Sequence, residues 1–203
     1  MKKTIASLVS CLFAFLSLAG DDANDHLNEA LPIDVPSGET WTYSGKISGT
    51  SSITKSGLGT LVLSNEENDF TGGLTINAGT VEVTKEGALG ADANPVQINY
   101  TADQLTGLLY FNAGTATFKQ PLTFAYAKAE LKATNLKFNG DTTLKGAIKY
   151  TGGSGGACGY LSTDTADCVV TIEGDVNRSI RYPMMLKGFK GEIHYQGAIL
   201  DGS

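Results

Sequence analysis

The residues best suited to acid–base or nucleophilic catalysis are few in this chain of 203 residues, which contains two histidines. His26 lies in an acidic stretch with Asp21, Asp22 and Asp25, and His194 lies in a segment where apolar and polar residues alternate. Nucleophilic catalysis needs a base within hydrogen-bond distance of the nucleophile and a third group that orients the base. Neither histidine has such partners at a recognisable spacing. We therefore predict that both are surface residues and that the chain has no catalytic residues.

A second candidate for chemistry is a group of charges near the C-terminus, formed by Asp175, Arg178 and Arg181. Cleavage of a polysaccharide needs paired carboxylates, or acidic metal ligands beside a basic residue. Arg178 and Arg181 are three positions apart, so on a regular strand their side chains would face opposite sides. We interpret the group as solvated charges at a corner. A β-helical polysaccharide lyase or hydrolase remains the alternative function, and it would require two acidic residues facing each other across a groove.

Two glycine-rich segments could be mistaken for ligand-binding loops. Asn139-Gly140-Asp141 lacks the repeated Gly-Asp ligands of calcium-binding β-rolls, and the acidic stretch around His26 is typical of solvated charge. Gly152-Gly153-Ser154-Gly155-Gly156 is not followed by the Lys-Ser/Thr pair of a phosphate-binding loop. We predict a turn at the first segment, a loop leaving the regular coil at the second, no metal site and no cofactor.

Three cysteines are present, and Cys11 falls within the N-terminal targeting segment described below. Cys158 and Cys168 remain as an even pair in an exported protein, separated by a short, polar loop, and we predict a disulfide between them. A disulfide that closes so short a loop is expected to contribute roughly 2–3 kcal/mol of stability. A redox or metal pair is the alternative, but it would need Cys-x-x-Cys spacing or nearby histidine ligands.

The first 19 residues are typical of a secretory signal peptide. Lys2 and Lys3 precede an apolar stretch from Ile5 to Leu18, and small residues near Ala19 suit cleavage. An uncleaved anchor is the alternative, and no later segment is apolar enough to cross a membrane. Loss of Lys2 and Lys3 changes the net charge from −6 to −8. An acidic chain of this kind is a poor partner for nucleic acid or for anionic membranes.

Residues 53–90 contain the clearest structural pattern, in which short strands alternate apolar and polar residues between glycine turns. The alternation places a set of apolar side chains on inward faces: Leu61, Leu63, Phe70, Leu74, Ile76 and Val81. Glycines supply the corner conformations that residues with a Cβ resist, at Gly57, Gly59, Gly72, Gly73 and Gly79. The pattern predicts many short strands joined by sharp corners, with very little helix.

This run closely resembles the autotransporter-associated β-strand repeat, a passenger-associated repeat of bacterial autotransporters. The motifs that carry the resemblance are Lys55–Ser64, Asn68–Gly73 and Thr75–Val81, and it covers about residues 43–90. The resemblance implies an all-β, right-handed parallel β-helix exported to the cell surface, and it implies no catalytic residues. A C-terminal membrane barrel needs many amphipathic strands of about ten residues, for which this chain is too short. We expect the translocator barrel to be a separate chain or missing.

Internal repetition extends beyond this run. Ile76–Val81 recurs 35 residues later as Phe111–Ala116, which we interpret as an offset of one or two coils. Five scattered tyrosines either contact a partner from the outside or lie within the coil: Tyr43, Tyr100, Tyr110, Tyr150 and Tyr160. The sequence leaves both possibilities open.

Together these features predict a signal peptide over residues 1–19, a lead-in or N-terminal cap over 20–38, and a passenger-type β-helix over 39–203 that is incomplete at its C-terminus. We expect a structural or adhesive module without catalytic activity, secreted or held at the cell surface in association with the outer membrane. The expected partners are a host or matrix protein or a polysaccharide.

Overall fold

The computed structural model describes residues 25–100, 107–126, 134–152, 160–178, 185–186 and 188–201. Within these ranges the chain forms 21 short strands and one 3-10 helix, η1 (Glu86–Leu89), with no α-helix. None of the described helical structure is long and apolar enough to cross a membrane. The predicted signal peptide, Cys158 and Arg181 lie outside the described residues.

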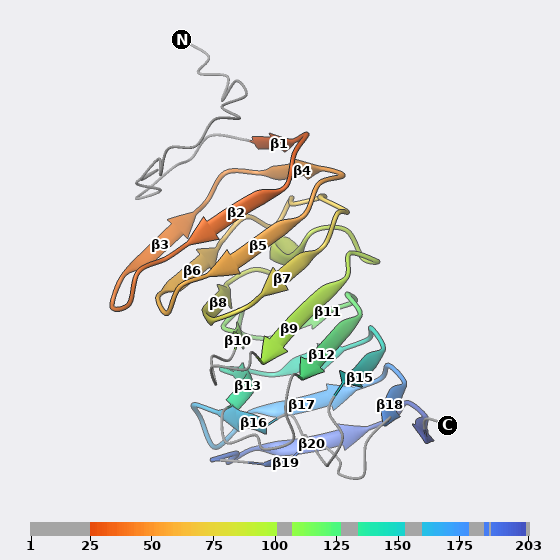
Figure 1. The fold of residues 1–203 in the computed structure, drawn as a ribbon. Coiled ribbons are helices and arrows are strands. Elements are labelled where there is room, and N and C mark those ends of the chain that lie inside the picture. The colour runs from red at the N-terminus through yellow and green to blue at the C-terminus, as the bar shows by residue number, and fades with distance from the viewer. Residues whose placement is uncertain are drawn as a thin grey trace.

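The strands stack into three long parallel sheets, with one short pair at the N-terminal end (Figure 1). The eight-stranded sheet has the order β2 (Leu31–Asp34), β5 (Ile53–Ser56), β7 (Leu74–Ile76), β9 (Val96–Tyr100), β12 (Leu122–Tyr126), β15 (Ile148–Gly152), β18 (Val176–Arg178) and β21 (Ile199–Asp201). The seven-stranded sheet runs from β3 (Thr40–Tyr43) through β6 (Thr60–Leu63), β8 (Gly79–Val83), β10 (Gly107–Phe111), β13 (Thr134–Phe138) and β16 (Tyr160–Thr163) to β19 (Met185–Leu186). The four-stranded sheet contains β11 (Ala116–Phe118), β14 (Thr142–Leu144), β17 (Val169–Ile172) and β20 (Glu192–Tyr195). The short pair joins β1 (Asp25–Leu27) to β4 (Ile47–Gly49), and pairing therefore begins within the 20–38 segment.

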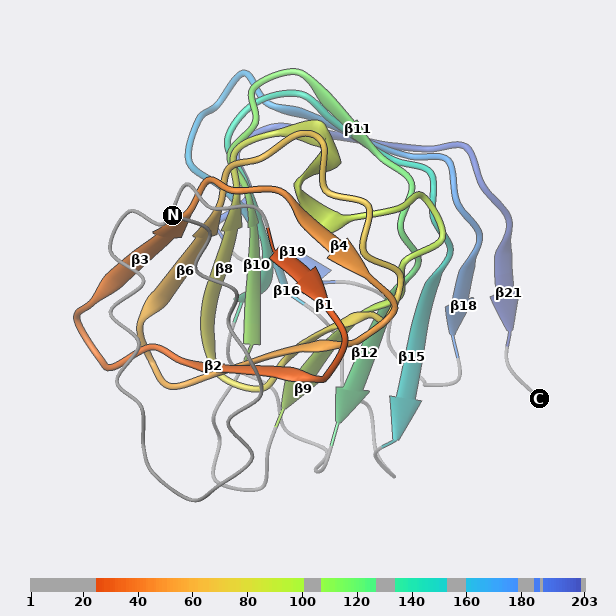
Figure 2. The same ribbon diagram turned by 90° about the horizontal axis from the view of Figure 1, so that it is seen from above.

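The chain coils in one direction, so each strand pairs in parallel with the equivalent strand of the next turn, as β5 does with β7. Seen from the N-terminal end, the path from β2 through β3 to β4 runs clockwise as it recedes from the viewer (Figure 2). A clockwise path that recedes is right-handed. The structure therefore confirms the predicted all-β, right-handed parallel β-helix.

The turns of the solenoid differ in length. Ile53, Leu74 and Val96 are in register on the eight-stranded sheet and are 21 and 22 residues apart. From Val96 the next steps, to Leu122 and Ile148, are each 26 residues. The interpretation of the 35-residue offset as whole coils is wrong, because Phe111 pairs with Val83 on the seven-stranded sheet, whereas Ile76 lies on the eight-stranded sheet. The two similar segments therefore occupy different corners, and both corners contain a glycine with positive φ, Gly79 and Gly114.

The core is one continuous apolar column built from inward positions of the stacked turns. On the seven-stranded sheet, Leu61, Val81, Leu109, Leu136 and Leu161 follow one another in register and are all 0% exposed. Aromatic side chains stack in the same way further along, with 5.2 Å between the ring centroids of Phe111 and Phe138. Stacking buries each turn on its neighbours, so no turn needs a core of its own.

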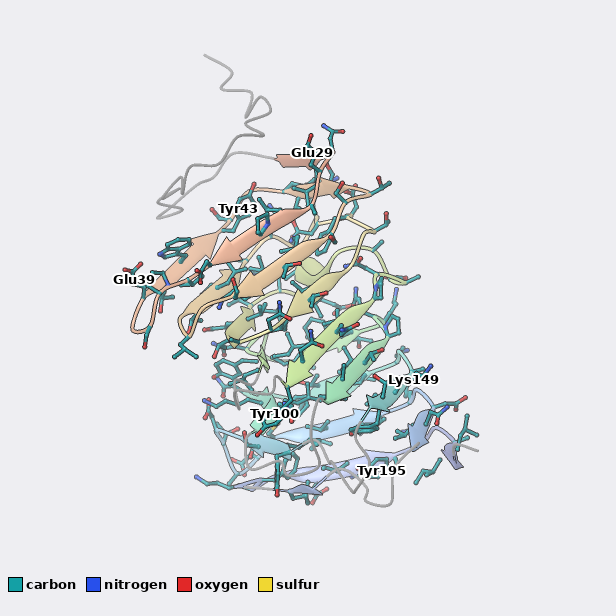
Figure 3. All side chains as sticks on the ribbon, in the orientation of Figure 1. Glu29, Glu39, Tyr43, Tyr100, Lys149 and Tyr195 are labelled. Carbon is teal, nitrogen blue, oxygen red and sulfur yellow. The ribbon has the colours of Figure 1, made fainter. Side chains whose placement is uncertain are left out.

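The structure separates the two possibilities for the tyrosines. Tyr43, Tyr100 and Tyr150 are buried in the column, and Figure 3 shows the first two among the side chains of the N-terminal and middle turns. Tyr150 stacks on Phe124 with 5.0 Å between ring centroids. Tyr110 and Tyr160 are partly exposed on the seven-stranded sheet. Most of these rings therefore contribute to the core.

On the third side of the early turns, buried amide side chains connect neighbouring turns where strand pairing is absent. Asn68 accepts a hydrogen bond from the Ile47 N–H at 2.8 Å and donates to the Ala88 carbonyl at 3.0 Å. One turn later, Asn94 accepts from the Gly73 N–H at 2.7 Å. These amides satisfy buried backbone groups that would otherwise be costly. The four-stranded sheet begins only after them, at β11.

Candidate binding surfaces

The residues proposed for the repeat core lie in the interior. Each of them is at most 1% exposed: Leu61, Leu63, Phe70, Leu74, Ile76 and Val81. The repeat glycines lie at the corners, and φ is positive at Gly57, Gly73 and Gly79. A Cβ at Gly79 would lie 2.5 Å from the carbonyl oxygens of both Gly57 and Gly59. At this corner the backbones of successive turns meet too closely for any side chain.

Lys55 is a core residue that the sequence analysis did not single out. It follows Ile53 by two positions on β5, is 0% exposed, and is in register with Ile76 of the next turn. Its ammonium group donates to the carbonyl oxygens of Ser56, Gly57 and Ala78 at 2.6, 2.9 and 3.2 Å. Burial lowers the pKa of Lys55 to about 8, and the nearby Asp34 opposes that shift. The alternation that places Ile53 inward also places Lys55 inward, which is the signal that could have identified it.

Cys168 is buried, and its thiol donates to the Gly140 carbonyl oxygen at 2.8 Å. It is a free cysteine within the described part of the chain, and the predicted partner, Cys158, lies outside that part. Burial raises the pKa of the Cys168 thiol, which suits a packed side chain better than a reactive thiolate. The Cys158–Cys168 disulfide stays a prediction.

The charged residues that the sequence offered as catalytic candidates lie at the surface or connect neighbouring turns by hydrogen bonds. His194 is exposed and lies 3.3 Å from a carboxylate oxygen of Glu192. Asp175 accepts the backbone N–H of Ala198 at 3.0 Å, which ties one turn to the next. The side chains of His26 and Arg178 lie outside the described atoms. The described residues contain no group of His, Cys, Asp and Glu that could hold a metal ion.

The outer face of the eight-stranded sheet carries two in-register rows of side chains, which we call the polar strip. Its members are Thr54, Thr75, Gln97, Thr123, Lys149 and Asn177 in one row, and Ser56, Asn77, Asn99, Ala125 and Thr151 beside it. Lys149 is the one charged member and is exposed on β15 (Figure 3). The Asn99 amide donates to the side-chain oxygen of Asn77 at 2.7 Å, and the Gln97 amide donates to Asn99 at 2.8 Å. The strip is therefore polar, nearly uncharged and partly fixed by its own hydrogen bonds.

The outer face of the seven-stranded sheet carries a charged cluster around Tyr110. The Tyr110 hydroxyl donates to Asp164 at 2.6 Å, Lys137 pairs with the other oxygen of Asp164 at 2.8 Å, and the Lys137 ammonium lies 4.5 Å from the Tyr110 ring centroid. Burial and then the contact with Asp164 raise the pKa of Tyr110. For Asp164, burial raises the pKa, but hydrogen bonds from Lys137 and Tyr110 and the charge of Lys190 outweigh it and the pKa is lowered. The cluster joins three successive turns by side chains that already satisfy one another.

An open recess of about 430 Å³ lies where η1 meets the start of the four-stranded sheet. Its lining comes from three successive turns: Glu66, Glu86, Gly87, Gly90, Asp92, Thr117, Lys119 and Gln120. Glu86 accepts the Thr117 backbone N–H at 3.2 Å, and Asp92 pairs with Lys119 at 2.8 Å. Two of the three carboxylates therefore hold β11 against the preceding turn. The sequence analysis did not identify this recess.

The repeat architecture is that of a right-handed parallel β-solenoid. Residues 53–83 match the passenger-associated-transport-repeat family, within the segment 43–90 that carried the resemblance, so that prediction is confirmed. The chain is also 36% identical over 135 residues to the adhesin BmaC autotransporter of Brucella suis biovar 1 (strain 1330). That match covers 55% of this chain and 4% of the adhesin, so the chain corresponds to a small part of its relative. No solved structure gives a significant match.

Proposed function

We propose that the protein is an exported, passenger-like module that acts as a structural or adhesive surface outside the cell, without catalytic turnover. Residues 1–19 serve as the signal peptide in this proposal, and the remainder is secreted or displayed in association with the outer membrane. One observation carries it: a filled apolar column supports regular rows of polar side chains on the outer faces. The similarity to an autotransporter adhesin supports the same function.

Display of the chain on a non-adherent bacterium tests the proposal. Cells that display the chain are expected to attach to host cells or matrix-coated plates above the level of cells with an empty display vector. Leu61→Asp is the matched control, because it disrupts the core while the exposed residues stay the same. Attachment equal to that of the empty vector, with the folded chain present at the surface, would refute the adhesive function.

A β-helical carbohydrate-active enzyme is the second candidate, and the recess is the observation that favours it. Glu66 and Glu86 come from adjacent turns and line the same hollow, as two acidic residues of such an enzyme must. Against this candidate, Glu86 and Asp92 are engaged with Thr117 and Lys119. Release of reducing sugars from polysaccharides, abolished by both Glu66→Gln and Glu86→Gln, would establish the enzyme. The adhesive proposal predicts no release.

A further inference from the structure

The polar strip differs in character from the other outer faces. Its rows run from Thr54 to Asn177 across six turns, and Lys149 is the one ionic side chain among the eleven members. Just beyond the N-terminal end of the strip, the exposed Asp34 of β2 lies in register with Ser56. The seven-stranded face, in contrast, carries the charged cluster of Tyr110, Lys137 and Asp164. The strip is therefore a nearly uncharged band on a protein whose net charge is −6.

Hydroxyl groups along the strip are available for an external partner. Thr54, Thr75 and Thr123 are half-buried on the outer face, and their hydroxyls have no hydrogen-bond partner among the described residues. Each hydroxyl can both donate and accept a hydrogen bond. Because neighbouring strands are about 4.8 Å apart, Thr54 and Thr75 lie one strand spacing apart along the solenoid. Thr123 lies two strands beyond Thr75, with Gln97 between them.

The composition of the strip argues for one class of partner. Protein partners are anchored mainly by Trp, Tyr and Arg, and the strip presents none of these residues. Nucleic acids and anionic polysaccharides need basic patches, which a single lysine on an acidic protein does not supply. A neutral polymer with many hydroxyl groups can pair with the Thr, Asn and Gln side chains without having to lose a strongly bound charge.

We propose that the polar strip binds a neutral polysaccharide that lies along the solenoid axis and contacts several turns at once. The inference rests on the proposed adhesive function and names its partner class. Each turn contributes a weak contact, and the contacts add because one polymer spans them all. The ordered amides of Asn77, Gln97 and Asn99 reduce the entropy lost on binding, since their side chains are already held.

Native gel electrophoresis in the presence of soluble polysaccharides tests this proposal on the exported chain. Hydroxyethylcellulose and galactomannan are the neutral probes, and polygalacturonate is the anionic probe. The neutral polymers are expected to retard the protein, and polygalacturonate is expected to leave its migration unchanged. Retardation by polygalacturonate alone, or by none of the three, would overturn the proposal.

Matched variants locate the site. Thr54→Val, Thr75→Val and Thr123→Val together remove three hydroxyls from the strip and are expected to weaken binding about tenfold or more. The control combines Thr60→Val, Thr80→Val and Thr143→Val, which lie half-buried on the other two sheets. An equal loss in both triple variants, with unchanged melting temperatures, would overturn the assignment to the strip.

The failure of this inference can be distinguished from the failure of the adhesive function. Periodate oxidises the neighbouring hydroxyls of sugars and leaves most of a protein surface intact. Attachment that survives periodate treatment of the target, together with no retardation by neutral polymers, overturns the polysaccharide proposal and leaves adhesion standing. Loss of attachment after periodate treatment of the target supports both the polysaccharide proposal and the adhesive function.

Discussion

The Lys55 ammonium group and the Ala78 carbonyl oxygen lie 3.2 Å apart in the interior, and this hydrogen bond joins two successive turns of the solenoid. The same ammonium also donates to Ser56 and Gly57, so one lysine satisfies three carbonyl oxygens at the corner between two sheets. A charged side chain in an apolar column is costly unless it is well hydrogen-bonded. The corner geometry of this repeat therefore depends on a residue that composition alone would assign to the surface.

Lys55 makes stability depend on pH in a defined window. Its pKa falls from 10.5 in the unfolded chain to about 8 in the folded protein, so between these values the unfolded chain binds more protons. The free energy of unfolding should therefore rise between pH 8 and 10.5, by up to about 3 kcal/mol, and be insensitive to this group below pH 8.

Urea denaturation at several pH values measures this effect as the difference between the parent and Lys55→Met. The difference isolates the contribution of Lys55 from that of the other titratable groups, which the two proteins share. A parent whose pH dependence matched that of the methionine variant would show that the buried lysine keeps its ordinary pKa.

The core assignment predicts opposite outcomes for one inward and one outward position of the repeat. Leu61→Asp places an unpaired carboxylate at a fully buried site and is expected to cost about 4 kcal/mol or more. Thr75→Asp lies on the outer face and should change stability by less than about 0.5 kcal/mol. Thermal melting followed by circular dichroism compares them, and a Leu61→Asp protein that melts like the parent would contradict the inward assignment.

A comparison of Gly79 with Gly38 separates two costs of replacing a glycine, the strained backbone conformation and the steric clash of the added Cβ. Both have positive φ, 67° and 82°, but a Cβ at Gly79 would meet two carbonyl oxygens, whereas one at Gly38 would meet nothing within 4 Å. Gly38→Ala should cost about 1 kcal/mol from the backbone conformation alone. Gly79→Ala should cost several times as much, on the order of 3 kcal/mol, because the stacked turns must also separate. Equal midpoints in denaturant would show that the corner has room for a side chain.

The predicted disulfide has a direct chemical test. Thiol titration of the denatured exported protein should detect no free thiol if Cys158 and Cys168 are joined, and two if both are reduced. The Cys168→Ser variant should then expose one thiol, from Cys158. Two thiols in freshly exported parent protein would contradict the bridge and leave Cys168 as the buried hydrogen-bond donor to Gly140.

The sequence was informative where local rules decide the structure. Leu61, Ile76 and Val81 alternate with polar residues between glycine turns, so their inward positions follow from strand periodicity. Lys55 obeys the same periodicity, and its burial depends on corner carbonyls that its side chain reaches beyond the apolar column. The charge of a lysine favours the surface, whereas its position on the strand indicates the interior.

The outer surfaces were harder to predict, because they depend on how far apart successive turns are in the sequence. Turns of 21 and 22 residues change to turns of 26, so no single offset aligns Gln97 with Thr123 as well as with Thr75. The recess has the same origin, since Glu66 and Lys119 meet only after three turns have stacked. Strand register, which one sequence does not specify, decides these neighbours.

Retention of the purified exported chain on immobilised host matrix or polysaccharide, with soluble products assayed in the same wells, is the most direct test of binding without turnover. The account predicts saturable retention of the parent, none for Leu61→Asp, and no sugar or peptide released over time. Release that grows with time, or parent retention that never exceeds that of Leu61→Asp, would contradict it.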